Sequence, residues 1–184
     1  RMAAGRFDEA VKAFTDVATQ HPSDPKPLYM RGECYRKMGR FKEAEADLRA
    51  AIKLDPSGKD EQMVVVMAEL GAVLTDAGRA AEAIEVLEQA VKARPDMFES
   101  HYNLGVAHES LKHWPEAIAA YGRAIKLKPQ DSNPRASQAD AQYNLAVVYR
   151  RAGRLEEAVA PAREAVQLAP DRPHAHLNLG MLLS

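Results

Sequence analysis

Histidine is the residue type in this sequence with the most potential for chemistry at neutral pH, and the chain contains six of them. His101 and His108 stand seven residues apart, so a helix would place both imidazoles on one face. A metal site would need further ligands, and no Cys, Asp or Glu stands at ligand spacing on that face. Both histidines also fall on packing positions of a repeat described below. We therefore expect structural histidines and no bound metal.

Cys34 is the only cysteine, which excludes an internal disulfide and a zinc site built on paired cysteines. It stands between Gly32 and Tyr35 on an expected packing seam, where an inert core thiol is the simpler hypothesis. The sequence contains no nucleophile elbow, phosphate-binding loop, dinucleotide-binding fingerprint or zinc-protease motif. We therefore expect a protein that is not an enzyme, with no catalytic residues and no cofactor.

The charge balance also limits the classes of partner. Lys and Arg total 25 against 26 Asp and Glu, a net charge of −1, so no basic field gathers nucleic acid or anionic membrane. The longest apolar run, at 63–68, is far shorter than the roughly 20 residues of a membrane span. No charged-then-apolar leader opens the chain. We expect a cytoplasmic protein, with an envelope location as the alternative if a leader or lipid anchor has been removed.

A six-residue pattern recurs five times along the chain. Its copies start at residues 5, 39, 78, 112 and 153, so the gaps are 34, 39, 34 and 41 residues, a 34-residue period with two insertions. Each copy ends in Ala, and each unit closes with a proline. The apolar spacing predicts two antiparallel helices per repeat. The turn between them carries Gly5, Gly39, Gly78 and Gly153, suited to a left-handed conformation.

Small residues recur where the two helices of each repeat must cross. The first helix of each unit has one of them, and a large residue follows the recurrent Ala four positions later in four of the five copies. Small residues at a crossing let two helices approach closely. The first-helix positions are Gly32, Gly71, Gly105, Ala146 and Gly180.

The order of Leu-Gly, Tyr, Ala, Phe and Pro resembles the tetratricopeptide repeat family, as in NLGVAHES at 103–110 followed by EAIAAYGRAIKLKP at 116–129. The resemblance covers essentially the whole chain and implies an all-α fold, a right-handed α-solenoid of stacked antiparallel helix pairs. Arg31 in place of the usual Leu, and His101 and His176 in a slot for bulky residues, depart from the family pattern.

On this register we predict one array over residues 1–184. Residues 1–24 are the second helix of a truncated repeat, 25–58, 64–97, 98–131 and 139–172 are full repeats, and 173–184 are the first helix of another truncated repeat. The insertions at 59–63 and 132–138 should extend the following helices at their N-terminal ends. Asn133 and Pro134 form a suitable N-cap and first-turn pair.

In this family the first helices of successive repeats line a concave groove, so the resemblance implies a non-enzymatic scaffold that binds a peptide segment or helix of a partner protein. A floor of Tyr, Val, Ala and Asn suits such a ligand. The same residues are close to the family's average sequence, so packing and solubility alone are the alternative explanation. The implied groove residues are Tyr29, Glu33, Glu69, Ala72, Tyr102, Asn103, Val106, Tyr143, Asn144, Val147, Arg150, Leu177 and Asn178.

A second function stays open, a substrate-recruiting arm of a larger enzyme such as a glycosyltransferase. The resemblance to a ladder of amides that draws in substrate polypeptide rests on Asn103, Asn144 and Asn178. A clamp for chaperone tails is disfavoured, because each possible register matches at most one of its five positions. RNA binding is disfavoured by acidic groove residues and by the near-zero net charge.

Overall fold

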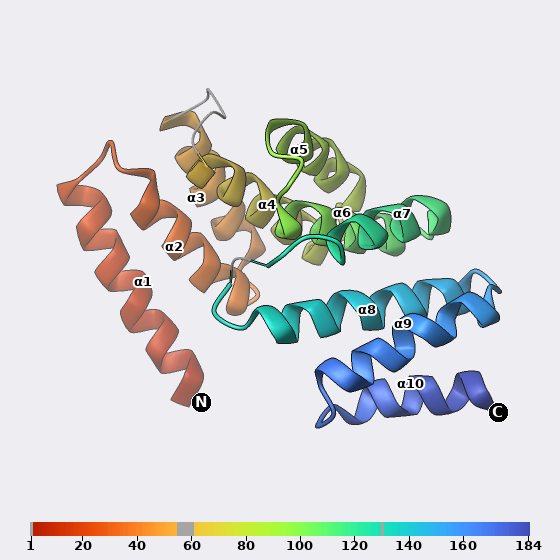
Figure 1. Cartoon of the computed structure of the whole chain (residues 1–184). Helices are drawn as coiled ribbons and strands as arrows, with labels where there is room; N and C mark the ends of the chain where they lie inside the picture. Colours follow the sequence, from red (N-terminus) through yellow and green to blue (C-terminus); the bar gives the residue numbers. More distant parts are fainter. Residues whose placement is uncertain (1, 55–60, 130) are drawn as a thin grey trace. The chain divides into compact units, whose positions relative to one another are not determined.

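Helices make up the secondary structure of the described part of this chain (Figure 1). The computed structural model describes residues 2–54, 61–129 and 131–184, and within these ranges it contains ten helices and no strand. The predicted all-α class is confirmed. The helices are α1 (Met2–Gln20), α2 (Pro25–Lys37), α3 (Phe41–Leu54), α4 (Glu61–Asp76), α5 (Ala80–Ala93), α6 (Phe98–Ser110), α7 (Trp114–Ala124), α8 (Pro134–Arg151), α9 (Leu155–Leu168) and α10 (Pro173–Leu183).

The helices belong to two compact units, Arg1–Pro95 with α1 to α5 and Asp96–Ser184 with α6 to α10. In the first unit, α2 pairs with α3 and α4 with α5, while α1 packs on α2 and α3 on α4. In the second unit, α6 pairs with α7 and α8 with α9, while α7 packs on α8 and α9 on α10. Packing of each element on its chain neighbours is the rule in helical repeats. The single array and its repeat boundaries remain a prediction.

Within the helix pairs, glycine faces a large side chain as the repeat pattern predicts. A Cβ built on Gly71 would lie 2.4 Å from Leu87 Cγ, and one on Gly105 would lie 2.7 Å from the ring of Tyr121. The recurrent alanines beside these large residues, such as Ala83 and Ala117, are completely buried. Only small residues at these positions let the two helices of a pair approach so closely.

Gly180, which the repeat pattern predicts to lie at a helix crossing, is different, because nothing lies within 4 Å of a Cβ built there. The close approach seen at Gly71 and Gly105 is therefore absent at Gly180 among the described residues. The apolar face of α10 is correspondingly open, with Leu177 65% and Met181 49% exposed.

The turns inside the helix pairs share one hydrogen-bond pattern. After α4, Gly78 N–H donates to Thr75 O at 3.0 Å and Arg79 N–H to Leu74 O at 2.8 Å, which is the Schellman arrangement that ends a helix with a left-handed residue. The left-handed residues are Gly39, Gly78 and Gly153, with φ of 73°, 79° and 78°, and Lys112, with φ of 60°.

Gly5 was expected to occupy such a turn, and that expectation is wrong. Gly5 lies inside α1, which runs without interruption from Met2 to Gln20.

Both insertions extend the helices that follow them. α8 begins at Pro134, and the side chain of Asn133 accepts a hydrogen bond from the backbone N–H of Ala136 at 3.3 Å, so the predicted N-cap is confirmed. α4 begins at Glu61, within the other insertion, whose residues 59–60 lie outside the described part of the chain.

Arg31, which departs from the family pattern, makes a bidentate ion pair with Asp47. Its Nε and Nη2 each lie 2.6 Å from a carboxylate oxygen, and its Nη1 donates to Thr15 Oγ1 at 2.9 Å. Asp47 is 8% exposed, and its hydrogen bonds hold the pKa of the Arg31 guanidinium above its ordinary value. Hydrogen bonds and an ion pair that connect α1, α2 and α3 therefore take the place of the apolar contact that Leu would make.

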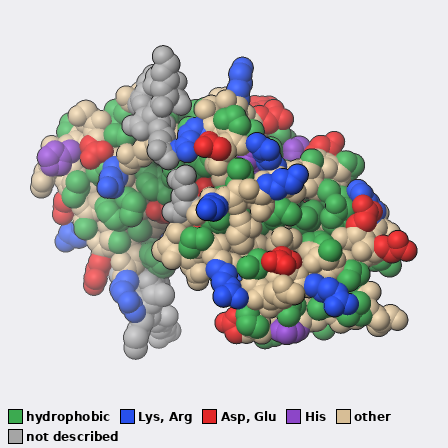
Figure 2. Space-filling view, viewed as in Figure 1, with side chains coloured by type: hydrophobic (Ala, Val, Ile, Leu, Met, Phe, Trp, Pro, Cys, Tyr) green, Lys and Arg blue, Asp and Glu red, His purple; other side chains and the backbone are tan. Residues whose placement is uncertain are grey.

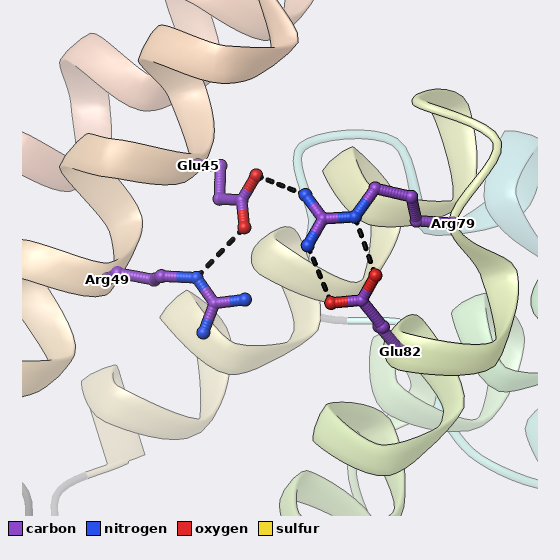
Figure 3. Close-up of polar contacts among 4 residues, drawn as sticks. All are labelled: Glu45, Arg49, Arg79 and Glu82. Atoms are coloured by element: carbon purple, nitrogen blue, oxygen red, sulfur yellow. Dashed lines mark hydrogen bonds and ion pairs between the residues drawn. The ribbon is translucent and has the colours of Figure 1, made fainter.

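A second polar network joins α3 to the start of α5 (Figure 3). Arg79 holds both oxygens of Glu82, at 2.7 and 2.6 Å, and also donates to Glu45, which accepts from Arg49 at 3.0 Å. Arg40 with Glu43 and Arg154 with Glu157 repeat the three-residue ion pair at other turns. In the recurring pattern, the Gly therefore adopts the left-handed conformation that the loop between the helices needs. The Arg and Glu form an ion pair across the first turn of the helix that follows.

Candidate functional site

The predicted groove residues all lie on the first helices of the pairs, α2, α4, α6, α8 and α10. We call the exposed side of these helices the first-helix surface and describe it for each unit separately. On the face of the molecule that Figure 2 shows, basic and acidic side chains are scattered among apolar ones, in keeping with the net charge of −1.

In the first unit, ion pairs between α2 and α4 occupy part of this surface. Arg36 on α2 lies 3.1 Å from Glu69 Oε2 and 2.7 Å from Asp76 Oδ2 on α4. Burial raises the pKa of Glu69, although Arg36 acts against that shift. Ala72 is 5% exposed, so it packs between helices and offers little surface to a partner. Tyr29 and Glu33 are half-buried on α2.

In the second unit, Tyr102 and Asn144 join α6 to α8. Asn144 Nδ2 donates to the Tyr102 hydroxyl at 3.0 Å. The ring of Tyr102 stacks on Phe98 with centroids 5.7 Å apart and meets Tyr121 edge-on at 5.8 Å. Burial, with the nearby Asp140 carboxylate, raises the pKa of Tyr102 to about 12. Tyr102 is therefore a packing residue as well as a surface residue.

A comparable contact joins α8 to α10. Arg150 Nε donates to Asn178 Oδ1 at 3.2 Å, and Asn178 is 2% exposed, with its Nδ2 buried without a hydrogen-bond partner. Val147, on α8, is also buried at 7% exposure. Asn178 and Val147 thus contribute to the joint between repeats and do not lie open on the surface.

Other predicted residues are more accessible. Leu177 is 65% exposed, and Tyr143 is half-buried and packs edge-on against His174 with centroids 4.8 Å apart. Val106 and Asn103 are half-buried on α6. The accessible residues of the second unit therefore lie on all three of its first helices.

A cavity of about 410 Å³ opens in the second unit and is lined by residues of α6, α7 and α8 and of the turn between α6 and α7. We call it the α6–α8 pocket. Glu109 lies within it, accepting from Tyr121 Oη and from Arg151 Nη1, both at 2.9 Å. Its lining residues are Val106, Glu109, Ser110, Lys112, Trp114, Tyr121, Asn144 and Arg151.

Of these lining residues, Val106 and Asn144 are among the thirteen groove residues named above, and Glu109, Ser110 and Arg151 also stand at positions that the family resemblance assigns to the groove. Lys112 and Trp114 could have been found from the sequence, because Lys112 stands where three other turns have glycine and Trp114 is the only tryptophan. Tyr121, the large residue four positions after the recurrent Ala117, is fully buried.

A slightly larger cavity, of about 440 Å³, lies in the first unit between α3, α4 and α5. Its lining comes mainly from the second helices of the pairs, including Arg49, Lys53, Glu82 and Glu85. It therefore lies apart from the first-helix surface.

The histidines do not assemble into a metal site in the part of the chain that the structure describes, where no group of three or more His, Cys, Asp or Glu could hold an ion. His101 is 7% exposed. The Nδ1 of His108 lies 3.5 Å from the Nδ1 of His113. Burial raises the pKa of the Cys34 thiol, which disfavours the reactive thiolate. Among the described helices, none has the length and apolar character to cross a membrane.

Two curated proteins and one solved structure illustrate what this chain is similar to. It is 27% identical over 123 residues to the probable UDP-N-acetylglucosamine–peptide N-acetylglucosaminyltransferase SPINDLY of Hordeum vulgare, a match that covers 66% of this chain and 13% of that protein. It is 31% identical over 101 residues to the Hsp70-Hsp90 organizing protein of Triticum aestivum, covering 55% of this chain and 16% of that protein. The chain thus spans less than a fifth of the length of these two relatives.

The solved structure is that of YrrB, described as a tetratricopeptide repeat protein with an unusual peptide-binding site, with a TM-score of 0.66 at 21% identity over 94% of this chain and 83% of that one. This likeness concerns the fold.

Models of the tetratricopeptide repeat match residues 25–96 in one case, and residues 69–132 and 132–173 in another. The second model alone spans more than half of the chain, and the matched residues carry the glycines, alanines and turns described above. The chain therefore belongs to the tetratricopeptide repeat family.

Proposed function

We propose that this protein is a non-enzymatic interaction scaffold and that the first-helix surface of its second unit binds a segment of a partner protein. The α6–α8 pocket carries the proposal, because it lies open beside predicted groove residues and has an aromatic, apolar and polar lining. Concave sites that combine apolar walls with a few placed polar groups are typical of binding sites. YrrB, whose fold is similar, has a peptide-binding site.

The accessible residues suggest where the segment runs. Tyr143 and the exposed Leu177 offer apolar contacts on α8 and α10, and the α6–α8 pocket, lined from α6, α7 and α8, includes the first-helix residues Val106 and Asn144 of the same unit. Aromatic and apolar anchors dominate the affinity of such interfaces.

The test is selection of a displayed library of random 12-residue peptides on the whole chain, followed by titration calorimetry with synthetic peptides. The double variant Tyr143→Ala/Leu177→Ala should bind selected peptides at least about tenfold more weakly, since truncated anchors at an interface cost more than about 1 kcal/mol each. Leu155→Ala is the matched control, because Leu155 is also exposed but lies on α9, a second helix. Equal affinities in wild type and the double variant, or failure to select any peptide, would overturn the proposal.

A substrate-recruiting arm of a larger enzyme is the second candidate, favoured by the match to a peptide N-acetylglucosaminyltransferase. That function would use the amides of Asn103, Asn144 and Asn178 to bind an extended backbone. Within the second unit, Asn144 and Asn178 already hydrogen-bond to Tyr102 and Arg150, which supports the first candidate. Replacing the three asparagines by Ala should therefore weaken the binding of selected peptides less than the double variant Tyr143→Ala/Leu177→Ala does. The opposite order would favour the amide ladder.

A further inference from the structure

The turn between α6 and α7 departs from the other three turns of its kind at two consecutive residues, Lys112 and His113, which replace Gly and Arg. Its hydrogen bonds are those of the other turns, with Lys112 N–H donating to Glu109 O and His113 N–H to His108 O, both at 2.9 Å. The left-handed position is therefore kept although its residue is lysine, with φ of 60°.

A lysine at this position is unfavourable for folding. A side chain in the left-handed region meets the backbone, which is why glycine predominates at the end of such helices. The other turns have Gly39, Gly78 and Gly153 there. Strain of this kind gathers at functional sites, where the side chain has a use that offsets it.

The position of Lys112 indicates the role of its side chain. Lys112 lines the α6–α8 pocket together with Trp114 and Arg151. At the following position, which His113 occupies in this turn, Arg40, Arg79 and Arg154 each pair with a glutamate three residues later. Lys112 forms no ion pair within the described residues.

The charges of the pocket do not balance. Glu109 accepts hydrogen bonds from Arg151 and Tyr121, so its charge is compensated inside the pocket. Lys112 and Arg151 against Glu109 leave one positive charge, which belongs to Lys112. A carboxylate from outside would compensate it, whereas a basic group would add a second unbalanced charge.

The other residues that line the pocket determine which group of the ligand can lie next to the carboxylate. Val106 and Trp114 contribute apolar surface, and Ser110 and Asn144 contribute polar groups. A volume of about 410 Å³ is within the usual range for ligand sites. It has room for a carboxylate side chain and a bulky apolar side chain next to it.

Resting on the proposed function, we propose that the α6–α8 pocket recognises an internal Asp or Glu of the bound segment, held by Lys112, with a bulky apolar neighbour against Trp114. The specificity of the scaffold then comes from a turn that departs from its own repeat pattern.

The experiment uses peptides selected from the random 12-residue library on the whole chain, synthesised with acetylated and amidated ends so that every carboxylate is a side chain. Selected peptides should contain Asp or Glu within two residues of a bulky apolar residue. Replacing that acid by its amide should weaken binding about tenfold, the worth of a hydrogen bond to a charged group.

Substitutions at Lys112 separate this role from a structural one. Lys112→Gly should weaken the binding of acidic peptides about tenfold. It should also raise the melting midpoint of the protein, because glycine relieves the strain of the left-handed backbone. Lys112→Asn, which also tolerates this conformation, should weaken them equally, and Lys112→Arg should retain binding. Lys126→Gln, at an exposed lysine outside the pocket, is the control and should change nothing.

The outcomes separate the two proposals. Peptides that bind through Tyr143 and Leu177 but show no acidic preference, or that bind equally to Lys112→Gly, overturn the inference and leave the scaffold function standing. Peptides that need a free C-terminus also overturn it, since the carboxylate would then be terminal. If no peptide is selected, the proposed function and this inference fail together.

Discussion

Asn144 on α8 and Tyr102 on α6, 42 residues apart in the chain, are joined by a hydrogen bond of 3.0 Å from the amide Nδ2 to the phenol oxygen. The contact lies between equivalent helices of successive pairs. Arg150 on α8 makes an analogous contact with Asn178 on α10. First-helix residues of the second unit therefore connect neighbouring helix pairs to one another.

The first prediction concerns the coupling between Tyr102 and Asn144. Tyr102→Phe and Asn144→Ala should each lower the unfolding free energy by about 1 kcal/mol, because each removes one side-chain hydrogen bond. The double variant should lose less than the sum, with a coupling energy of about 0.5–1.5 kcal/mol. Urea unfolding of the four proteins measures it, and strictly additive losses would contradict the contact.

Tyr102 also predicts a pH dependence at alkaline pH. Its folded-state pKa of about 12 is above the ordinary value of 10.0, so its contribution is fully present below pH 10 and is lost as the pH rises through 12. Relative to Tyr102→Phe, the wild type should lose about 2–3 kcal/mol of unfolding free energy across that window. Parallel stability curves for the two proteins would show that the tyrosine is not held neutral by burial.

The pair of Arg31 and Asp47 predicts an asymmetry between single and double substitutions. Asp47→Ala should cost about 3 kcal/mol, because it leaves a partly buried guanidinium without its partner. Arg31→Leu with Asp47→Leu should cost within about 1 kcal/mol, since apolar packing replaces the whole pair. Chemical unfolding compares them, and a double variant no more stable than Asp47→Ala would mean that the site cannot accept apolar side chains.

Two glycines predict opposite effects of the same substitution. Gly71→Ala should destabilise by about 1–3 kcal/mol, because its Cβ would lie 2.4 Å from Leu87 Cγ. Gly122→Ala should stabilise by about 0.5–1 kcal/mol, since glycine in a helix interior is entropically costly, and nothing lies within 4 Å of a Cβ there. Thermal unfolding decides between them, and effects of the same sign would falsify the assignment of Gly71 to the helix crossing.

The sequence was sufficient for the parts of the fold that depend on neighbours in the chain. The 34-residue recurrence of Gly, Ala and Pro predicted the helix pairs, and the left-handed glycines at Gly39, Gly78 and Gly153 follow from the same pattern. The Asn133 cap was also predictable, because it depends on an amide only three residues away.

The use of each surface residue was decided only by the tertiary structure. Asn144 and Asn178 look alike in sequence, yet one donates to Tyr102 and the other accepts from Arg150 while almost completely buried. Gly180 fits the pattern of a helix crossing but faces open space. The repeat pattern specifies which helices pack together, whereas these outcomes depend on distances between side chains of different helices. The α6–α8 pocket depends on such distances too, because no local sequence pattern groups its lining residues together.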